Sequence, residues 1–260
     1  MAVTGAKVRQ RAGSTTPAPS LRTKVTQPEK PRYLKGLLFG PPKTGKTTAV
    51  ATGPKPLLIE TDPGGEDSLV GQKVDIIRPT NWKEMNKIVE GLHGADADVW
   101  ETVALDSATF LFELFGAKKI AKAYRENTEP RIQYGKTGSA VNDILHGLLA
   151  LNMHVLITAH VVIVHADDTE AMKRVNPELG RYQISPSVSP MVNKILLPAV
   201  SFIGRTYKKY EYDKATKKQR ARYYVLFDDS NKSPASQRNM GLPGEVENFD
   251  LSKLLIEREG

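Results

Sequence analysis

The sequence predicts an α/β fold, with a mainly parallel sheet that is flanked by helices and extended by a C-terminal β-hairpin. Short apolar runs alternate with segments of helical periodicity, which is the pattern of parallel strands joined by crossover helices. A glycine-rich loop, GPPKTGKT at 40–47, directly follows the first apolar run. Two strand-like segments joined by a basic turn come later in the chain, and this pattern is typical of a hairpin that extends a sheet.

Each element of this fold is indicated by a local pattern. Buried strands are predicted by the apolar runs at 33–39, 56–60, 74–77, 99–106 and 154–160. Helices are predicted at 82–92, 110–120 and 139–152. The first helix would place on one face the side chains of Trp82, Met85, Ile88, Val89 and Leu92. The hairpin is predicted from 199–212 and 220–229, and the long segment 161–194 between the last core strand and the hairpin is expected to be a loop.

Composition limits the classes of function. The 260 residues are 40% hydrophobic and 25% charged, which is enough for one large packed domain. The absence of cysteine excludes disulfides, thiolate nucleophiles and cysteine-based zinc sites. No apolar run reaches the length of a membrane helix and the N-terminus has no apolar signal core, so we expect a cytoplasmic protein without a membrane partner. The net charge of +8 favours a polyanionic partner or reflects a merely basic surface.

Residues 1–31 differ in composition from the rest of the chain. They are rich in Ser, Thr, Pro and basic residues and contain little apolar periodicity. We expect a flexible basic arm at 1–31, followed by a single domain at 32–260. Two interpretations of the arm stay open, a segment that touches nucleic acid and a solvated leader without a role.

The loop at 40–47 predicts a nucleotide site. Gly40, Gly45, Lys46 and Thr47 match the pattern G-x-x-x-x-G-K-[ST], in which backbone N–H groups wrap a phosphate at the start of a helix. Lys46 would reach the β- and γ-phosphates, and Thr47 would place its hydroxyl on Mg²⁺. The residues expected to bind the nucleotide are Gly40, Pro41, Pro42, Lys43, Thr44, Gly45, Lys46, Thr47 and Thr48. Pro41 and Pro42 would hold the loop preformed, whereas Lys43 is left to face either a neighbouring subunit or solvent.

Carboxylates at the ends of two predicted strands supply the rest of the site. Asp106 ends the strand at 99–106 and is expected to hold Mg²⁺ together with Thr47. Glu60 and Asp62 lie at the end of the second strand, where a carboxylate would lie beside the γ-phosphate and orient water. We place Asp62 ahead of Glu60 for this catalytic role, and the alternative is that Asp62 caps the Asp-Pro-Gly-Gly turn. His160 would touch the γ-phosphate or only bond locally.

These motifs, in this order, resemble the RecA-like ATPase core, and more closely the compact phage single-strand annealing ATPases. The resemblance runs from Tyr33 to Glu257 and rests on LLFGPPKTGKTT, PLLIETDPGGEDSL, TVALDS, QYG, VLITAH and SQRNMGLPG. It implies a RecA-like P-loop core, ATP and Mg²⁺ as cofactors, and, for a phage-encoded protein, the cytoplasm of the bacterial host.

The resemblance also implies roles for single residues. Asp62 matches the position of the acidic residue that polarises the attacking water, although the family pattern is close to IDTEGG and this chain has a shorter side chain followed by Pro63. His160 matches the polar sensor position. Arg238 matches a basic residue that reaches the nucleotide of a neighbouring subunit, although Ser236 stands where the family often has lysine. A role for Arg238 in trans requires a homo-oligomer, either a ring or a filament.

In RecA-like proteins the segment after the sensor grips single-stranded DNA. The corresponding segment, 161–194, offers cations and one aromatic ring at Lys173, Arg174, Arg181, Tyr182 and Lys194. Four acidic residues in the same segment dilute this charge. The hairpin adds a further set of cations and tyrosines, which either contact DNA or form a solvated ribbon whose tyrosines pack on the core.

The sequence therefore predicts an ATP-dependent protein that binds single-stranded DNA and promotes strand annealing or exchange, with DNA-stimulated ATP hydrolysis at subunit interfaces. Family resemblance alone adds a single-stranded DNA-binding protein as a helper. Three alternatives stay open: a nonenzymatic annealing or loading factor switched by ATP, a helicase-type motor, and a small-molecule kinase. The last is disfavoured because nothing in the chain resembles a lid and an acceptor site.

Overall fold

A computed structural model describes residues 33–62, 64–126, 128–165, 182–213, 217–229, 232–238 and 240–259. Tyr33–Gly260 forms one compact unit. The predicted arm at 1–31 lies outside the described residues, so its boundary with the domain stays a prediction. Within the described part of the chain, no helix is long and apolar enough to cross a membrane.

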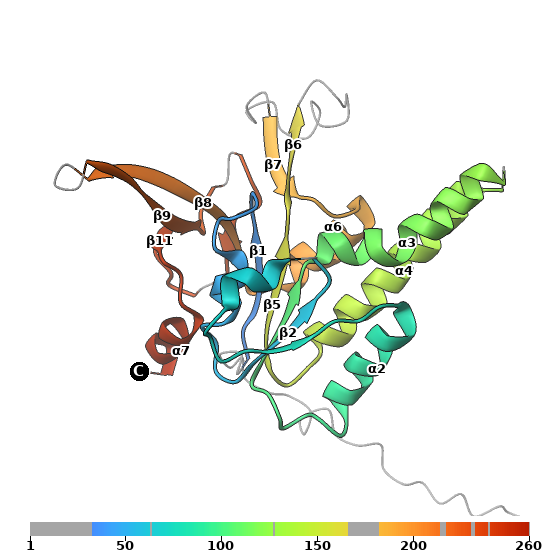
Figure 1. Cartoon of the computed structure of the whole chain (residues 1–260), viewed down its shortest axis with the longest axis horizontal. Coiled ribbons are helices and arrows are strands. Elements are labelled where there is room, and N and C mark those ends of the chain that lie inside the picture. Colours follow the sequence, from blue (N-terminus) through green and yellow to red (C-terminus); the bar gives the residue numbers. More distant parts are fainter. Residues whose placement is uncertain are drawn as a thin grey trace, which may run out of the picture. The chain divides into compact units, whose positions relative to one another are not determined.

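The main sheet has the strand order β11-β9-β8-β1-β5-β4-β2-β3, and β10 pairs with β8 (Figure 1). Its parallel core consists of β1 (Lys35–Phe39), β5 (His154–Ala159), β4 (Thr102–Asp106), β2 (Pro56–Glu60) and β3 (Asp75–Ile77). On the other side of β1, β8 (Phe202–Asp213) is parallel to it. The antiparallel additions are β9 (Lys218–Leu226), β10 (Ser236–Gln237) and β11 (Glu245–Glu247).

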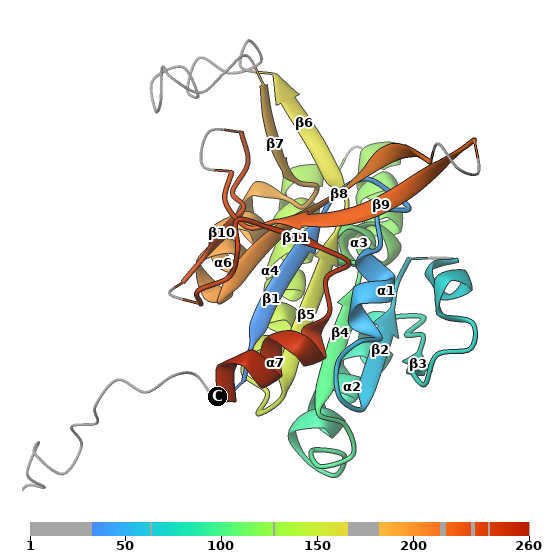
Figure 2. The same ribbon diagram turned by 90° about the vertical axis from the view of Figure 1, so that its left-hand side faces the viewer.

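Helices cover both faces of the sheet. One face packs against α2 (Trp82–His93), α3 (Ala108–Arg125), α4 (Pro130–Leu149) and α6 (Pro190–Ala199). The other face packs against α1 (Lys46–Val50), the short 3₁₀ helix η2 (Gly65–Leu69) and α7 (Leu251–Glu259). Figure 2 shows α1 and α7 in front of the parallel strands and α4 behind them. This arrangement confirms the predicted fold class, a P-loop α/β core with a C-terminal hairpin extension.

Both faces of the sheet are packed against helices, which explains why the sequences of the strands are continuous apolar runs. Every residue of β2 and β4 is buried, because side chains on both faces of these strands meet a helical layer. Polar caps then fix where the helices begin: the side chain of Asn81 accepts a hydrogen bond from the Glu84 amide at 3.0 Å, and the side chains of Ser107 and Ser189 cap α3 and α6.

Several boundaries differ from those predicted. The helix predicted at 139–152 begins at Pro130, and two of its interior glycines, Gly138 and Gly147, lie in close packing contacts. A Cβ atom at Gly138 would stand 2.8 Å from the Met191 sulfur, and one at Gly116 of α3 would stand 2.3 Å from Thr137 of α4. These glycines therefore let α3, α4 and α6 approach closely rather than ending a helix.

The segment 161–194, predicted to be a loop, contains regular structure at both of its ends. β6 (Val161–His165) and β7 (Tyr182–Pro186) form a separate antiparallel ribbon that projects from the sheet in Figure 1. α6 then begins at Pro190. The prediction was wrong for these elements because the ribbon strands are short and follow β5 after a single residue, so their periodicity merges with that of the core strand.

Candidate nucleotide-binding site

The phosphate loop joins β1 to α1, and its backbone needs glycine at two positions. Gly45 has φ 86, a left-handed conformation that glycine adopts without steric cost. At Gly40, a Cβ atom would stand 2.2 Å from the Thr206 hydroxyl oxygen. The hydroxyls of Thr206 and Thr44 lie 2.6 Å apart, so strand β8 supports the loop from below.

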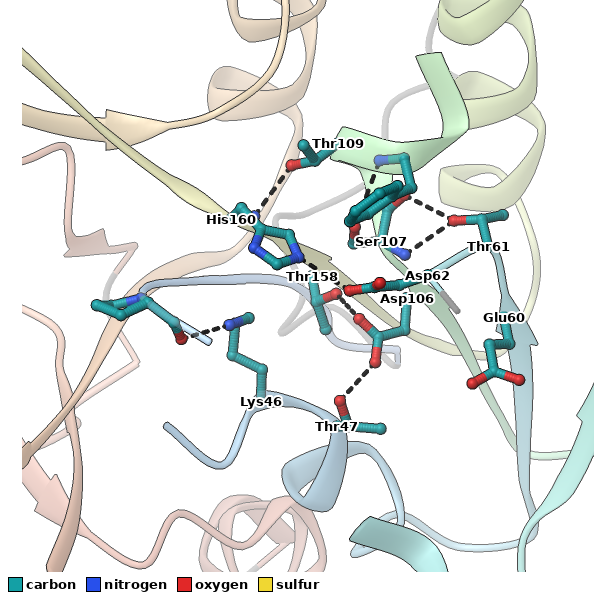
Figure 3. Close-up of polar contacts among 12 residues, drawn as sticks. Lys46, Thr47, Glu60, Thr61, Asp62, Asp106, Ser107, Thr109, Thr158 and His160 are labelled. Atoms are coloured by element: carbon teal, nitrogen blue, oxygen red, sulfur yellow. Dashed lines mark hydrogen bonds and ion pairs between the residues drawn. The ribbon is translucent and has the colours of Figure 1, made fainter. Parts of the chain in front are cut away.

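Lys46 is buried under this loop. Its ammonium group donates to the backbone oxygens of Gly40 at 3.0 Å and Pro41 at 2.8 Å. Figure 3 shows the Lys46 side chain on the same side of the sheet as Thr47, Asp106 and His160. Burial lowers the pKa of this ammonium group, and the negative charges of Asp106 and Asp62 oppose that shift. A buried cation beside two carboxylates, with its hydrogen bonds directed to the loop, is suited to bind an anion in the loop.

Asp106 is held by two threonines from different elements. The Thr47 hydroxyl, on α1, donates to Asp106 Oδ2 at 2.6 Å, and the Thr158 hydroxyl, on β5, donates to Asp106 Oδ1. Asp106 and Thr158 are almost completely buried, at 3% and 0% exposure. The sheet order explains this contact, because β5 lies between the strand that carries the phosphate loop and the strand that ends at Asp106. A carboxylate and a hydroxyl this close supply hard oxygen ligands that fit Mg²⁺.

Asp62 and His160 form a bonded pair beside the loop. Asp62 Oδ2 lies 2.9 Å from His160 Nε2. The amide of His160 donates to the Thr109 hydroxyl at 3.0 Å, and the imidazole stands edge-on to the Phe110 ring at 5.3 Å between centroids. Both members of the pair are about a quarter exposed, with side-chain exposures of 25% for His160 and 23% for Asp62. They are therefore positioned by the fold and still open to a ligand.

Glu60 lies close to this site but has other partners. Its Oε2 accepts from Arg78 Nε at 2.6 Å, and its Oε1 accepts from the Glu66 amide at 3.0 Å. Arg78 also pairs with the Glu66 carboxylate. Glu60 is 5% exposed and does not line the cavity described below. Its contacts support the turn between β2 and η2, so the arrangement favours Asp62 for any role on water.

One cavity of about 390 Å³ brings these groups together. Its walls include most of the predicted site, namely Pro42, Lys43, Thr44, Gly45, Lys46, Thr47, Thr48, Asp62, Asp106 and His160. Gly64, Gly65, Asp67 and Ser68, at the start of η2, complete the walls. Among the described residues there is no cluster of three or more His, Cys, Asp or Glu side chains that could hold a metal ion. Thr47 and Asp106 stay the predicted metal-binding residues.

The remaining predicted residues lie away from the cavity. Arg238 is exposed, its amide donates to the Ser201 oxygen at 3.0 Å, and its guanidinium donates to the Pro198 oxygen. Because Ser201 bonds to Lys35 at the start of β1, Arg238 lies at the end of the sheet opposite the phosphate loop. Lys194 is an exposed residue of α6. Lys173 and Arg174, together with Arg181, lie outside the described residues, and Tyr182 is described only as a strand position.

Sequence reasoning missed the residues that orient the main groups. Thr158 and Thr109 were not predicted, yet one bonds Asp106 and the other bonds the His160 backbone. Thr158 carries a usable signal, since it is a polar residue inside the apolar run VLITA, two positions before His160. Thr109 carries no such signal, because it follows a strand and begins a helix like many surface threonines.

Comparison with known proteins agrees with a nucleotide site. A family model described as AAA domain matches residues 32–238. No curated protein matches the chain. Among solved structures, the crystal structure of the RadB recombinase is similar, with 15% sequence identity, a TM-score of 0.44, and coverage of 82% of this chain and 86% of the other.

Proposed function

Since this chain belongs to the AAA domain family, we propose that it is a P-loop ATPase that binds single-stranded DNA and promotes strand annealing or exchange. The observation that carries the ATPase proposal is that the phosphate loop, the buried Asp106 and the Asp62–His160 pair line the same cavity. This cavity holds groups that would bind nucleotide phosphates, a metal ion and an attacking water.

The roles of the cavity residues follow from their contacts. The loop amides and the Lys46 ammonium would bind the β- and γ-phosphates, exchanging the Gly40 and Pro41 oxygens for phosphate oxygens. Thr47 and Asp106 would hold Mg²⁺, which neutralises developing charge on the phosphates when bound. Asp62 would accept a hydrogen bond from the attacking water and orient it. His160 would donate to the γ-phosphate, which makes its bond to Asp62 responsive to the nucleotide.

The DNA-binding proposal is supported by the connection between the nucleotide site and the projecting ribbon. β6 begins at the residue after His160, and the amide of Ser187 returns to donate to the His160 oxygen at 2.8 Å. Both ends of the segment 161–186 are therefore tied to one residue of the cavity wall. We propose that this segment, whose sequence has basic residues between its two strands, binds DNA when ATP is bound. This assignment rests on the motif order and on this connectivity.

The oligomeric proposal concerns Arg238. It lies at the end of the sheet away from its own cavity and is exposed, so any contact with nucleotide would be made in a neighbouring copy. A head-to-tail assembly, either a ring or a filament, places one end of a subunit against the opposite end of the next. Arg238 would then stabilise the transition-state charge in trans. A single-stranded DNA-binding protein is proposed as a helper partner.

The test is ATP turnover by the full chain with and without single-stranded DNA, beside DNA binding across a salt series. We expect DNA to stimulate turnover and DNA affinity to fall steeply with salt, because counterions are released from the phosphates. Lys46→Ala should abolish turnover. The complete absence of DNA binding at moderate salt, with and without ATP, would overturn the DNA role.

A second candidate function is an annealing or loading factor that binds ATP as a switch and hardly hydrolyses it. The observation that favours it is the Asp62–His160 bond, since the carboxylate that would orient water already has a partner at 2.9 Å. Asp62→Asn separates the two functions. Strand annealing that persists without turnover in this variant supports the switch, and annealing lost together with turnover supports the enzyme.

A further inference from the structure

A second cavity, of about 530 Å³, adjoins the phosphate cavity. The two share a wall, because both are lined by Lys43, Thr44, Gly45, Thr48 and Ser68. From this wall the second cavity runs along the outer side of α1, past Ala49 and Thr52, toward strand β9 and the turn before α7. A nucleotide whose phosphates occupy the loop must place its sugar and base in a space that is continuous with the loop, and the second cavity is such a space.

One wall of this cavity is an exposed aromatic ring. Tyr223 is 40% exposed, and its ring lies beside the phosphate loop, because a Cβ atom added to Gly45 would stand 3.7 Å from Tyr223 Cδ1. The neighbouring Tyr224 is differently engaged, since its ring stacks on Tyr207 at 5.7 Å and carries Lys209 above it at 4.4 Å. The remaining aromatic wall residue, Phe249, is 9% exposed and belongs to the core. Tyr223 is therefore the ring that a flat ligand would meet.

The polar edge of the cavity comes from the turn before α7. Asn248 has φ 49, a left-handed conformation that asparagine tolerates better than most residues. Its backbone N–H donates to the backbone oxygen of Tyr223 at 2.8 Å. This bond fixes Asn248 beside Tyr223. The nearby Asp250 is already used, because its Oδ1 accepts from the amides of Ser252 and Lys253 at the start of α7. The side-chain amide of Asn248 is exposed, and its Nδ2 donates one hydrogen bond to Glu247 Oε1 at 3.5 Å, which leaves its second N–H and its oxygen for a ligand at the edge of the ring.

We propose that this cavity binds the base of the nucleotide, with a purine ring stacked on Tyr223 and its polar edge bonded by Asn248. The edge of any base carries donor or acceptor atoms that an amide can bond, and a purine is favoured because stacking grows with ring area. The inference rests on the nucleotide binding proposed above. It assigns Tyr223 to the nucleotide and gives strand β9 a direct contact with the bound ligand.

The experiment compares three ligands of the full chain: ATP, UTP and inorganic tripolyphosphate, which lacks a base. The native protein should prefer ATP to both. Tyr223→Ala should weaken ATP binding by about fivefold to 150-fold, the range that stacking of one base on one aromatic ring spans. It should leave tripolyphosphate binding unchanged, because the phosphate cavity is intact. Tyr223→Phe should bind ATP as the native protein does.

A second variant and a control keep the test decisive. Asn248→Gly retains the left-handed backbone and removes only the amide, so it should also weaken ATP relative to tripolyphosphate. Tyr124→Ala removes a tyrosine of α3 that is 64% exposed and should change neither affinity. Equal loss of ATP and tripolyphosphate binding in Tyr223→Ala, or no loss of either, would overturn the base site while leaving the phosphate site standing. A native protein that binds neither ligand would overturn the nucleotide site itself, and this inference with it.

Discussion

Replacement of Thr158 by valine tests how Asp106 is held. Valine has nearly the same shape but no hydroxyl, so Asp106 Oδ1 loses the hydrogen bond that Thr158 donates in a completely buried position. A hydrogen bond to a charged group contributes about 2 kcal/mol to the free energy of unfolding. For a domain of this size, that loss lowers Tm by about 4–8 °C.

Thr158→Ser is the matched control. It keeps the hydroxyl and removes one buried methyl group, at a cost of about 1 kcal/mol. We therefore expect valine to be the more damaging substitution, although it retains more apolar volume. Thermal and urea unfolding of the three proteins without nucleotide measure the difference. In ATP titrations, the valine variant should lose affinity in the presence of Mg²⁺ and keep its affinity in EDTA.

A specific outcome would refute this reasoning. If Thr158→Val were as stable as the native protein, or more stable than Thr158→Ser, the hydroxyl would not support the Asp106 carboxylate. An equal loss of ATP affinity with and without Mg²⁺ would separately refute the link from Thr158 through Asp106 to the metal.

Three further predictions concern packing, pH and assembly. Gly36→Ala would place a Cβ atom 2.2 Å from the buried Phe202 ring and should cost about 1–3 kcal/mol, whereas Gly135→Ala, inside α4 with open space around it, should be neutral or stabilising by up to ~1 kcal/mol; thermal unfolding measures both. Burial lowers the pKa of Lys35 to about 8 from its ordinary 10.5, so the unfolded chain binds more protons between those values and stability should rise with pH across that window. Allowing for solvent screening of this half-buried group, the gain is about 1–2 kcal/mol, and the stability difference between native protein and Lys35→Met in urea at pH 7 and pH 10 should report it. In mixtures of Arg238→Ala with Lys46→Ala subunits, turnover should partly recover if Arg238 acts in trans, and steady-state assays that show no recovery would contradict that role.

Local signals explain what the sequence predicted well. Gly40, Gly45 and Lys46 belong to one contiguous pattern, and the apolar run before it marks strand β1. Both the loop and its position at the carboxyl end of a strand were therefore predictable. Asp106 was predictable for the same reason, since it ends an apolar run. These features depend on neighbours in the chain, and neighbours are visible in a single sequence.

Contacts between distant segments explain what the sequence did not predict. Tyr223 meets Gly45 and Asn248 only after β9 folds beside the phosphate loop, and no periodicity reports that meeting. Glu60, a predicted catalytic residue, bonds to Arg78, which directly follows β3. This contact between distant segments gives the Glu60 carboxylate a partner that the sequence did not indicate. The start of α4 at Pro130 was missed, and the close approach of Gly138 to Met191 of α6 likewise joins segments that are distant in the chain.

The ribbon attached to His160 has a mechanical consequence. β6 and β7 are joined through five residue pairs, and a strand rises about 3.3 Å per residue, so the paired part reaches about 16 Å beyond its base. A tilt at the base of the ribbon therefore becomes a larger displacement at its far end: a tilt of about 10° would move that end by about 3 Å. The proposed exchange of the His160–Asp62 hydrogen bond for one to a γ-phosphate would be a small movement within the cavity. At the far end of the ribbon, such a tilt would produce a displacement close to the spacing between stacked bases.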